Sequence, residues 1–118
     1  MSHQKQVVEK YMDGFRSTDH QTILSCLTDD VEWVMPGFFS HKGIEQFDKE
    51  IENPNADGHP SITISRMTEE ANVVIAEGEV HAKMKDGSKL DAVFCDVFEF
   101  REGKISKLTT YLMFTKPN

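Results

Sequence analysis

One carboxylate lies among aromatic residues in a stretch that is typical of a β-strand. Phe94, Asp96 and Phe98 alternate along residues 89 to 101 and therefore share one face of the predicted strand. Burying an unpaired carboxylate costs several kcal/mol, so this position needs a reason. We interpret Asp96 as a candidate acid/base group in a pocket. The alternative is a purely structural aspartate that hydrogen-bonds to a neighbouring threonine, Thr109 or Thr110.

A histidine on the preceding strand is predicted to lie on the same face as this aspartate. Asp86-Gly87 is typical of a two-residue hairpin turn. Such a turn pairs Lys85 with Ser88 and places His81 and Asp96 on one face of neighbouring strands. We therefore expect His81 to be the companion of Asp96. The alternative is a solvated histidine near the end of the hairpin.

The same strand offers a metal site as a further alternative. Glu77, Glu79 and His81 alternate and have the ligand types that a metal ion takes. No second histidine stands at a spacing that completes the set, so we predict neither a metal nor a cofactor. Cys26 and Cys95 form no CxxC pair and are expected to be reduced and buried.

Composition limits the classes of function. The 118 residues suit one domain spanning residues 1–118. The net charge of −7 and the lack of a basic stripe argue against a nucleic acid partner. The chain has neither an apolar run long enough to cross a membrane nor a signal peptide, so we expect a cytoplasmic protein without a membrane partner.

Hydrophobic periodicity predicts helices in the first half of the chain and strands in the second. Asp19 is the expected N-cap of a short second helix that ends near Leu27. The predicted helices are 4–17, 19–27 and 43–52, the predicted strands are 31–37, 61–68, 73–84, 89–101 and 104–114, and 53–60 is a loop. This order indicates an α+β fold with helices packed on one face of a curved sheet.

Both faces of the predicted sheet carry apolar residues. Val93, Cys95 and Val97 lie on the face opposite Asp96. A sheet that is apolar on both sides needs cover on both. Three helices can cover one face, and we expect a second copy of the chain to cover the other, giving a homodimer.

Three segments together resemble the nuclear transport factor 2-like superfamily: YMDGFRSTDHQTILSCLTDDVEW, GIEQF and CDVFEFREGKISKL. Within it, the chain resembles the SnoaL-like polyketide cyclases and the bacterial ketosteroid isomerases. The resemblance covers nearly the whole chain. It implies a cone-shaped fold, with three N-terminal helices packed on a curved antiparallel sheet and a ligand pocket inside the cone.

The resemblance also implies roles for individual residues. In ketosteroid isomerases a tyrosine and a neutral aspartic acid stabilise an oxyanion, and Tyr11 and Asp96 match these positions. The base of those enzymes falls near Met35, which cannot abstract a proton. In the cyclases a late-strand aspartate acts beside a histidine, and Asp96 and His81 fit that pattern. Plain core packing of Tyr11 is the alternative.

Aromatic and sulfur-containing side chains are the expected wall of the pocket, because small-molecule sites are largely apolar. The predicted substrate-binding residues are Phe15, Trp33, Met35, Phe39, Phe47, Phe98, Tyr111 and Met113. His41 lies in the segment GFFSHKG, which we expect to be an exposed loop at the pocket mouth.

Three functions remain open at this point. The first is a small-molecule-binding, acid/base enzyme of the isomerase or cyclase type, acting beside a carbonyl group with Asp96, His81 and Tyr11. The second is a non-catalytic ligand-binding or dimerisation module of the same fold. The third resembles an epoxide hydrolase and needs an Asp-Arg-Asp arrangement built on Arg16, Arg66 or Arg101. The expected ligand is small and either apolar or carbonyl-containing.

Overall fold

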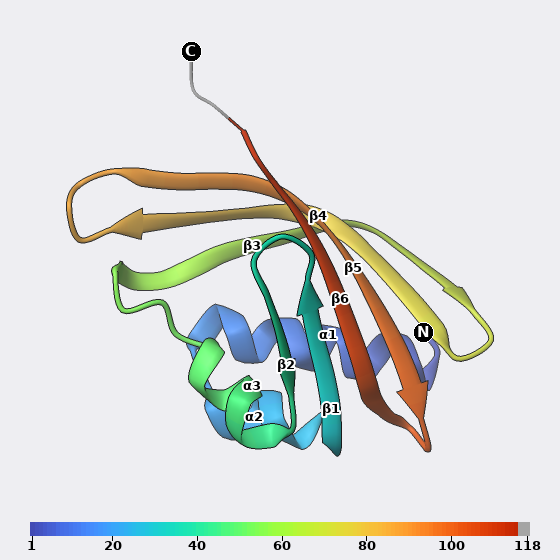
Figure 1. Cartoon of the computed structure of the whole chain (residues 1–118). Coiled ribbons are helices and arrows are strands. Elements are labelled where there is room, and N and C mark those ends of the chain that lie inside the picture. Colours follow the sequence, from blue (N-terminus) through green and yellow to red (C-terminus); the bar gives the residue numbers. More distant parts are fainter. Residues whose placement is uncertain (116–118) are drawn as a thin grey trace.

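A six-stranded sheet curves around one long helix, with two short helices beside it (Figure 1). The computed structural model describes residues 1–115. The helices are α1 (His3–Ser17), α2 (His20–Ser25) and α3 (Ile44–Glu50). The strands are β1 (Leu27–Met35), β2 (Phe39–Lys42), β3 (Ala56–Glu70), β4 (Val73–Met84), β5 (Lys89–Arg101) and β6 (Lys104–Phe114). The predicted α+β class and cone-shaped arrangement are confirmed.

The helix ends follow from local capping chemistry. The Ser2 side chain accepts a hydrogen bond from the backbone N–H of Lys5 at 3.1 Å and starts α1. Thr18 ends α1 in the left-handed conformation, with φ of 53°. Asp19 caps α2 as predicted and accepts a hydrogen bond from Thr22 N–H. These caps fix the direction of α1, whose buried side carries Val8, Tyr11 and Met12, with the half-buried Phe15 beyond them.

The strand order is β2-β1-β6-β5-β4-β3. The neighbouring pairs are antiparallel except β1 and β6, which run parallel. The sequence did not predict this parallel pair. Register shifts interrupt β3 between Asp57 and Ser61 and again between Ile64 and Arg66, and such bulges bend a sheet. The three helices of residues 1–115 lie on the concave side of the resulting cone, and none of them covers the other face of the sheet (Figure 1).

Several predicted boundaries are wrong. The loop predicted at 53–60 is shorter, because β3 already begins at Ala56. GFFSHKG is not a loop throughout, since residues Phe39–Lys42 form the short edge strand β2. β1 begins at Leu27, where a helix end was expected. Each error falls where a segment is stabilised by pairing with a neighbouring strand rather than by its own residue pattern.

The β4–β5 turn differs from the prediction by one residue, and this has the largest effect. Lys83 pairs with Lys89, so residues 85–87 form a three-residue loop, with Gly87 at a φ of 88°. Every β4–β5 pair is therefore shifted by one position. Asp96 pairs with Ala76, and His81 pairs with Asp91. Because side chains alternate, His81 lies on the opposite face of the sheet from Asp96.

The core fills the wide part of the cone between α1, α3 and the sheet. Trp33 stacks on Phe47, with ring centroids 4.4 Å apart, and Tyr11 meets the edge of Phe98 at 5.3 Å. Phe47 and Phe98 are almost fully buried. None of the helices in residues 1–115 combines the length and the apolar character that a membrane crossing requires.

Candidate functional site

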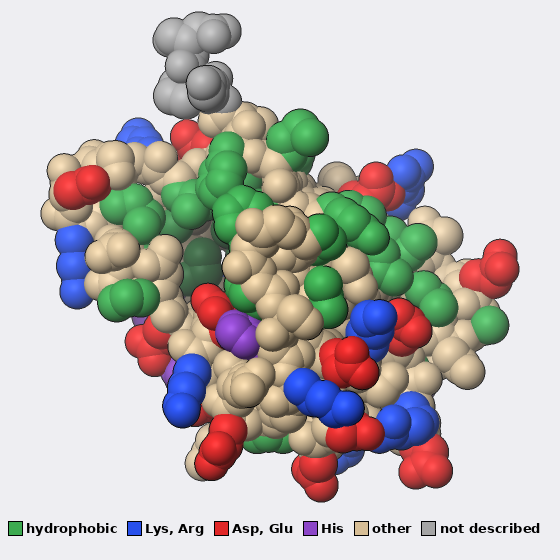
Figure 2. Space-filling model, viewed as in Figure 1, with side chains coloured by type: hydrophobic (Ala, Val, Ile, Leu, Met, Phe, Trp, Pro, Cys, Tyr) green, Lys and Arg blue, Asp and Glu red, His purple; other side chains and the backbone are tan. Residues whose placement is uncertain are grey.

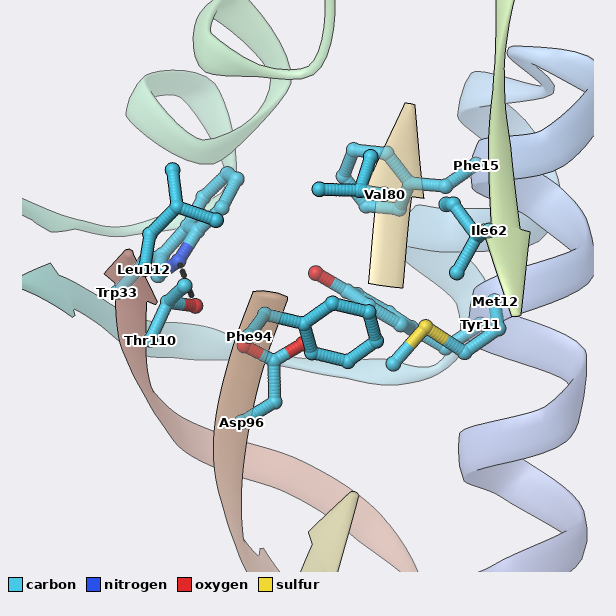
Figure 3. A pocket seen from close by; sticks show the side chains of 10 residues that line it. All are labelled: Tyr11, Met12, Phe15, Trp33, Ile62, Val80, Phe94, Asp96, Thr110 and Leu112. Atoms are coloured by element: carbon cyan, nitrogen blue, oxygen red, sulfur yellow. Dashed lines mark hydrogen bonds between the residues drawn. The ribbon is translucent and has the colours of Figure 1, made fainter. Parts of the chain in front are cut away.

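An apolar cavity of about 120 Å³ lies between α1 and the concave face of the sheet. Figure 3 shows its wall, which draws on α1, β1, β3, β4, β5 and β6. The lining residues are Tyr11, Met12, Phe15, Trp33, Ile62, Val80, Phe94, Asp96, Thr110 and Leu112. Among these lining residues, the polar side-chain atoms come from Tyr11, Asp96, Thr110 and the Trp33 N–H. A bound ligand would therefore have few hydrogen-bonding partners.

Asp96 brings a buried carboxyl group to this cavity from β5. The residue is only 8% exposed, and its Oδ1 is buried with no hydrogen-bond partner among the described residues. Desolvation raises the pKa of Asp96 to about 7, while the nearby Thr110 hydroxyl acts in the opposite direction. A carboxyl group with this pKa exchanges a proton near neutral pH, which suits a general acid or base.

Tyr11 presents its hydroxyl group from α1 toward the middle of the cavity, on the side that faces Asp96 (Figure 3). Its ring packs against Phe15 and Phe98, which hold it in place. Burial raises the pKa of Tyr11 well above its usual value, and the neighbouring Asp96 charge raises it further. Tyr11 therefore keeps its proton and can donate a hydrogen bond to a ligand oxygen.

Trp33 and Thr110 form a buried hydrogen bond at the edge of the same cavity. The Trp33 indole N–H donates to Thr110 Oγ1 at 3.1 Å (Figure 3). Thr110 is also the direct partner of Asp96 on the neighbouring strand. Because the Thr110 oxygen already accepts from Trp33, its own O–H remains available to donate toward the Asp96 side. The hydrogen bond between Trp33 and Thr110 therefore fixes the position of the Thr110 hydroxyl group in the cavity wall.

A second and larger cavity of about 490 Å³ opens beyond the first one. Phe15, Val80 and Leu112 belong to both walls and mark the boundary between the two. Met35 borders this outer cavity, together with residues 51–53 and the β4–β5 hairpin. In Figure 2 a hollow bordered by hydrophobic side chains opens beside this hairpin. The shared residues place the outer cavity directly beside the inner cavity that contains Asp96.

The structure places some of the predicted site residues elsewhere. His81 lies on the outer face, where its Nδ1 is 2.6 Å from Asp91 Oδ1, and this contact raises the pKa of His81. Tyr111 and Met113 are also on the outer face, 54% and 69% exposed. The prediction for His81 was wrong because the β4–β5 loop is one residue longer than expected. The predictions for Tyr111 and Met113 were wrong because Thr110 and Leu112 are the residues of β6 that point inward.

The remaining predicted lining residues fall into two groups. Phe15 and Trp33 line the inner cavity, and Met35 lines the outer one. Phe47 and Phe98 pack behind the cavity as core residues instead of lining it. Phe39, on the edge strand, stacks with His41 at 4.5 Å and also borders neither cavity. His41 is half-buried and lies 2.7 Å from Glu50, so the prediction that it is exposed is wrong.

The metal alternative and the epoxide hydrolase alternative both lack the necessary geometry. No group of three His, Cys, Asp or Glu side chains within residues 1–115 is arranged to hold a metal ion. Arg66 pairs with Glu77 at 2.6 Å on the outer face. The other two arginines contact Asp13 and Asp30, and none of the three borders either cavity. An Asp-Arg-Asp site is therefore not formed.

Six of the ten residues in the inner wall were not predicted from the sequence. Phe94 and Thr110 were considered only as neighbours of Asp96, and Met12, Ile62, Val80 and Leu112 were not predicted as lining. Phe94 and Thr110 could have been predicted. Both side chains lie on the same face of β5 and β6 as Asp96, because side chains alternate along each strand. The position of Ile62 depends on the bulges in β3, which no local pattern revealed.

Comparison with solved structures confirms the fold. An LEH-like epoxide hydrolase from M. tuberculosis superimposes with a TM-score of 0.82 at 18% identity, covering 94% of this chain and 83% of that one. TerC, co-crystallised with polyporic acid, gives 0.83 at 21% identity, with 97% and 92% coverage. A putative ketosteroid isomerase from Kribbella flavida gives 0.77 at 17% identity, with 98% and 82% coverage.

Comparison at the level of sequence families agrees with the structural result. No curated protein matches the chain. The family model that matches is described as a SnoaL-like domain, and the match runs over residues 8–108. This range includes Tyr11, Trp33 and Asp96 and ends two residues before Thr110. The chain therefore belongs to the SnoaL-like domain family and has the nuclear transport factor 2-like cone fold.

Proposed function

We propose that the protein binds a small, largely apolar carbonyl compound in the inner cavity and catalyses proton transfer beside the carbonyl group. The observation that carries this proposal is the buried, unpartnered Oδ1 of Asp96, which borders the same cavity as the Tyr11 hydroxyl. A buried carboxyl oxygen without a partner is costly, and such groups are common where a ligand supplies the missing contact.

The proposed reaction uses two groups. Ionised Asp96 removes a proton from the carbon next to the carbonyl group, and the C–H electron pair moves into the forming C=C bond of the enolate. Tyr11 donates a hydrogen bond to the carbonyl oxygen as negative charge develops there. The protonated Asp96 then returns the proton to a carbon of the same enolate, so the carboxylate is regenerated. Return of the proton to the γ-carbon of a dienolate, which forms from a substrate with a neighbouring C=C bond, shifts that double bond and is an isomerisation. In a cyclisation the enolate carbon instead attacks a second carbonyl carbon, the C=O electron pair moves onto the oxygen, and protonated Asp96 delivers the proton to this alkoxide.

The alternative is a non-catalytic ligand-binding module. The observation in its favour is that Asp96 is the only carboxyl group bordering the inner cavity, within the residues described. Met35, near the position of the isomerase base, borders the outer cavity and cannot transfer a proton. In this case a protonated Asp96 and Tyr11 would both donate hydrogen bonds to one ligand oxygen.

Deuterium exchange separates the two candidates. Acetophenone has one ring, which suits the inner cavity, and exchangeable protons beside its carbonyl group. Incubation in D₂O with the wild-type protein should exchange these protons faster than buffer alone, as followed by NMR, and Asp96→Asn should remove the increase. The exposed Asp29 provides the matched control, Asp29→Asn, which should keep it.

Binding is measured in parallel, because a ligand of the folded state raises the melting temperature. Acetophenone binding without faster exchange would favour the non-catalytic module. If neither acetophenone nor related one-ring ketones raised the melting temperature at millimolar concentration, both candidates would be rejected.

We also propose that the outer face of the sheet forms a homodimer interface. Val93, Tyr111 and Met113 are exposed on this face of β5 and β6. The outer face of β4 carries Glu77, Glu79, His81 and Lys83 instead, so the apolar surface is narrower than the sequence predicted. A second copy would bury this strip. Light scattering that shows a monomer at micromolar concentration would contradict the interface.

A further inference from the structure

We infer that the ligand is an elongated neutral molecule with a second oxygen at its far end, and that His59 and Thr18 bind this oxygen in the outer cavity. The inference rests on the proposed function of the inner cavity, which supplies the binding site for the carbonyl end. It adds a second polar site and a length requirement. Neither His59 nor Thr18 belongs to the inner cavity.

The volumes of the two cavities favour a two-part ligand. The inner cavity, at about 120 Å³, is slightly smaller than the engineered cavity of about 150 Å³ that admits benzene. It therefore holds about one ring next to Asp96 and Tyr11. The outer cavity, at about 490 Å³, has the volume of an ordinary small-molecule site. A ligand that filled both would extend from the carbonyl end past Phe15, Val80 and Leu112.

The middle of this path is apolar. Beyond the shared boundary, the outer wall carries the side chains of Met35, Ile51, Ala82, Met84 and Leu90. Among the described residues, this wall has no lysine or arginine to bind a negatively charged ligand group, and its one carboxylate, Glu52, is paired with His20. A neutral hydrocarbon segment is the ligand chemistry that fits this part of the path.

His59 and Thr18 form a polar pair on the outer wall. Thr18 Oγ1 and His59 Nδ1 are 2.7 Å apart. The left-handed conformation of Thr18 at the end of α1, together with the irregular stretch of β3 between Asp57 and Ser61, brings the two side chains together. With Nδ1 engaged by Thr18, the other ring nitrogen of His59 is the one left to meet a ligand oxygen.

Two other polar side chains on the outer wall, Glu52 and Asn53, each have one oxygen atom engaged in a hydrogen bond. Glu52 Oε2 lies 2.5 Å from His20 Nε2. Asn53 Oδ1 accepts a hydrogen bond from the Asn55 backbone N–H at 2.9 Å. Of the polar side chains on this wall, the pair of His59 and Thr18 is therefore the one best placed to receive a ligand group.

The strand register gives the separation of the two polar ends. Asp96 pairs with Ala76 on β4, whereas His59 lies between the pairs of Asp57 with Lys83 and of Ser61 with His81. His59 is thus level with Ala82, six residues along β4 from the level of Asp96. At about 3.3 Å per residue, this corresponds to roughly 20 Å. Side chains reach inward from both ends, so a fitting ligand is somewhat shorter than this span.

The test uses phenyl ketones with straight alkyl chains of increasing length, each prepared with and without a terminal hydroxyl group. Dissociation constants are measured by calorimetry. The wild-type protein should bind the hydroxylated ketone of one particular length roughly two- to tenfold more tightly than its methyl-terminated partner, the gain expected from one neutral hydrogen bond. Shorter chains should show no such preference.

Variants assign this preference to the proposed pair. His59→Ala should abolish it, so that the hydroxylated and methyl-terminated ketones of that length bind this variant equally tightly, and Thr18→Val should reduce it. His41→Ala is the matched control, because His41 is another partly exposed histidine and borders neither cavity. His59→Gln retains a hydrogen-bonding side chain and should keep part of the preference, which separates loss of the contact from a general disturbance of β3.

The outcomes separate this inference from the proposed function. If the ketones bind and Tyr11→Phe weakens them, but no chain length shows a hydroxyl preference, the inference is overturned and the inner site remains. A preference that survives in both His59→Ala and Thr18→Val also overturns it. If no ketone of any length binds the wild-type protein, the proposed function is rejected and this inference with it.

Discussion

Asp96 and Thr110 are direct partners on β5 and β6, and both side chains reach the same cavity. Thr110 in turn accepts a hydrogen bond from the Trp33 N–H. A carboxyl group, a hydroxyl group and an indole thus follow one another across three adjacent strands. This arrangement links the buried carboxyl group of Asp96 to Trp33 in the hydrophobic core.

Asp96→Asn should change how the free energy of unfolding depends on pH. The pKa of Asp96 is raised from about 3.9 in the unfolded chain to about 7 in the folded protein, so the folded state holds the proton more tightly. The stabilisation is complete below pH 4 and is lost as the pH rises through 7, by roughly 4 kcal/mol at most. Urea unfolding at pH 5 and pH 8 should show a smaller loss in Asp96→Asn than in the wild type. Equal losses would contradict the assignment.

Thr110→Val should raise the pKa of Asp96 above that of the wild type. The hydroxyl group lowers this pKa, and valine has nearly the same shape without the hydroxyl. The substitution also leaves the Trp33 N–H without its partner, which should cost about 1–3 kcal/mol of stability. An NMR titration of the carboxyl carbon measures the pKa. Thr110→Ser, which keeps a hydroxyl group, should resemble the wild type.

Gly78→Ala should destabilise the protein. A Cβ at Gly78 would lie 2.1 Å from the Thr63 carbonyl oxygen and 2.9 Å from Phe94 Cζ. The first of these is a backbone atom of β3, so the strands must move apart, at a cost of about 1–3 kcal/mol. Thermal unfolding measures the effect. Thr63→Ala leaves the carbonyl group in place and serves as the control, and a melting temperature of Gly78→Ala equal to the wild type would rule out the close approach.

His81→Ala should leave ketone binding and deuterium exchange unchanged. The histidine lies with Asp91 on the outer face, on the far side of the sheet from the inner cavity. Its effect on stability should stay within about 0.5 kcal/mol, as for most exposed positions. A loss of acetophenone-dependent exchange in this variant, with normal folding by circular dichroism, would show that His81 contributes to the reaction after all.

The sequence predicted the parts of the site that depend on alternation within one strand. Phe94, Asp96 and Phe98 share a face because β5 is regular there. The helical spacing of apolar residues in α1 correctly predicted that Tyr11 points inward. Relations between strands were harder to predict. A single extra residue in the β4–β5 loop moved His81 to the other face, and residue types alone favour a two-residue turn at Asp86-Gly87.

The outer cavity could not be predicted for a related reason. Its wall combines the ends of α1, α3 and β1 with the irregular start of β3, and these segments are distant in the chain. The left-handed Thr18 and the bulge next to His59 bring them together. Such contacts depend on tertiary packing, to which the residue pattern of each short segment contributes little.

The parallel pairing of β1 with β6 also bears on how the chain acquires its structure. β6 follows the other five described strands in the sequence, yet it lies between β1 and β5 in the sheet. Before β6 has been synthesised, the β1–β2 hairpin and the β3–β5 meander cannot become parts of one sheet. Strands β1 and β5 then each have an unpaired edge. The six-stranded sheet can therefore be completed only after β6 has been synthesised.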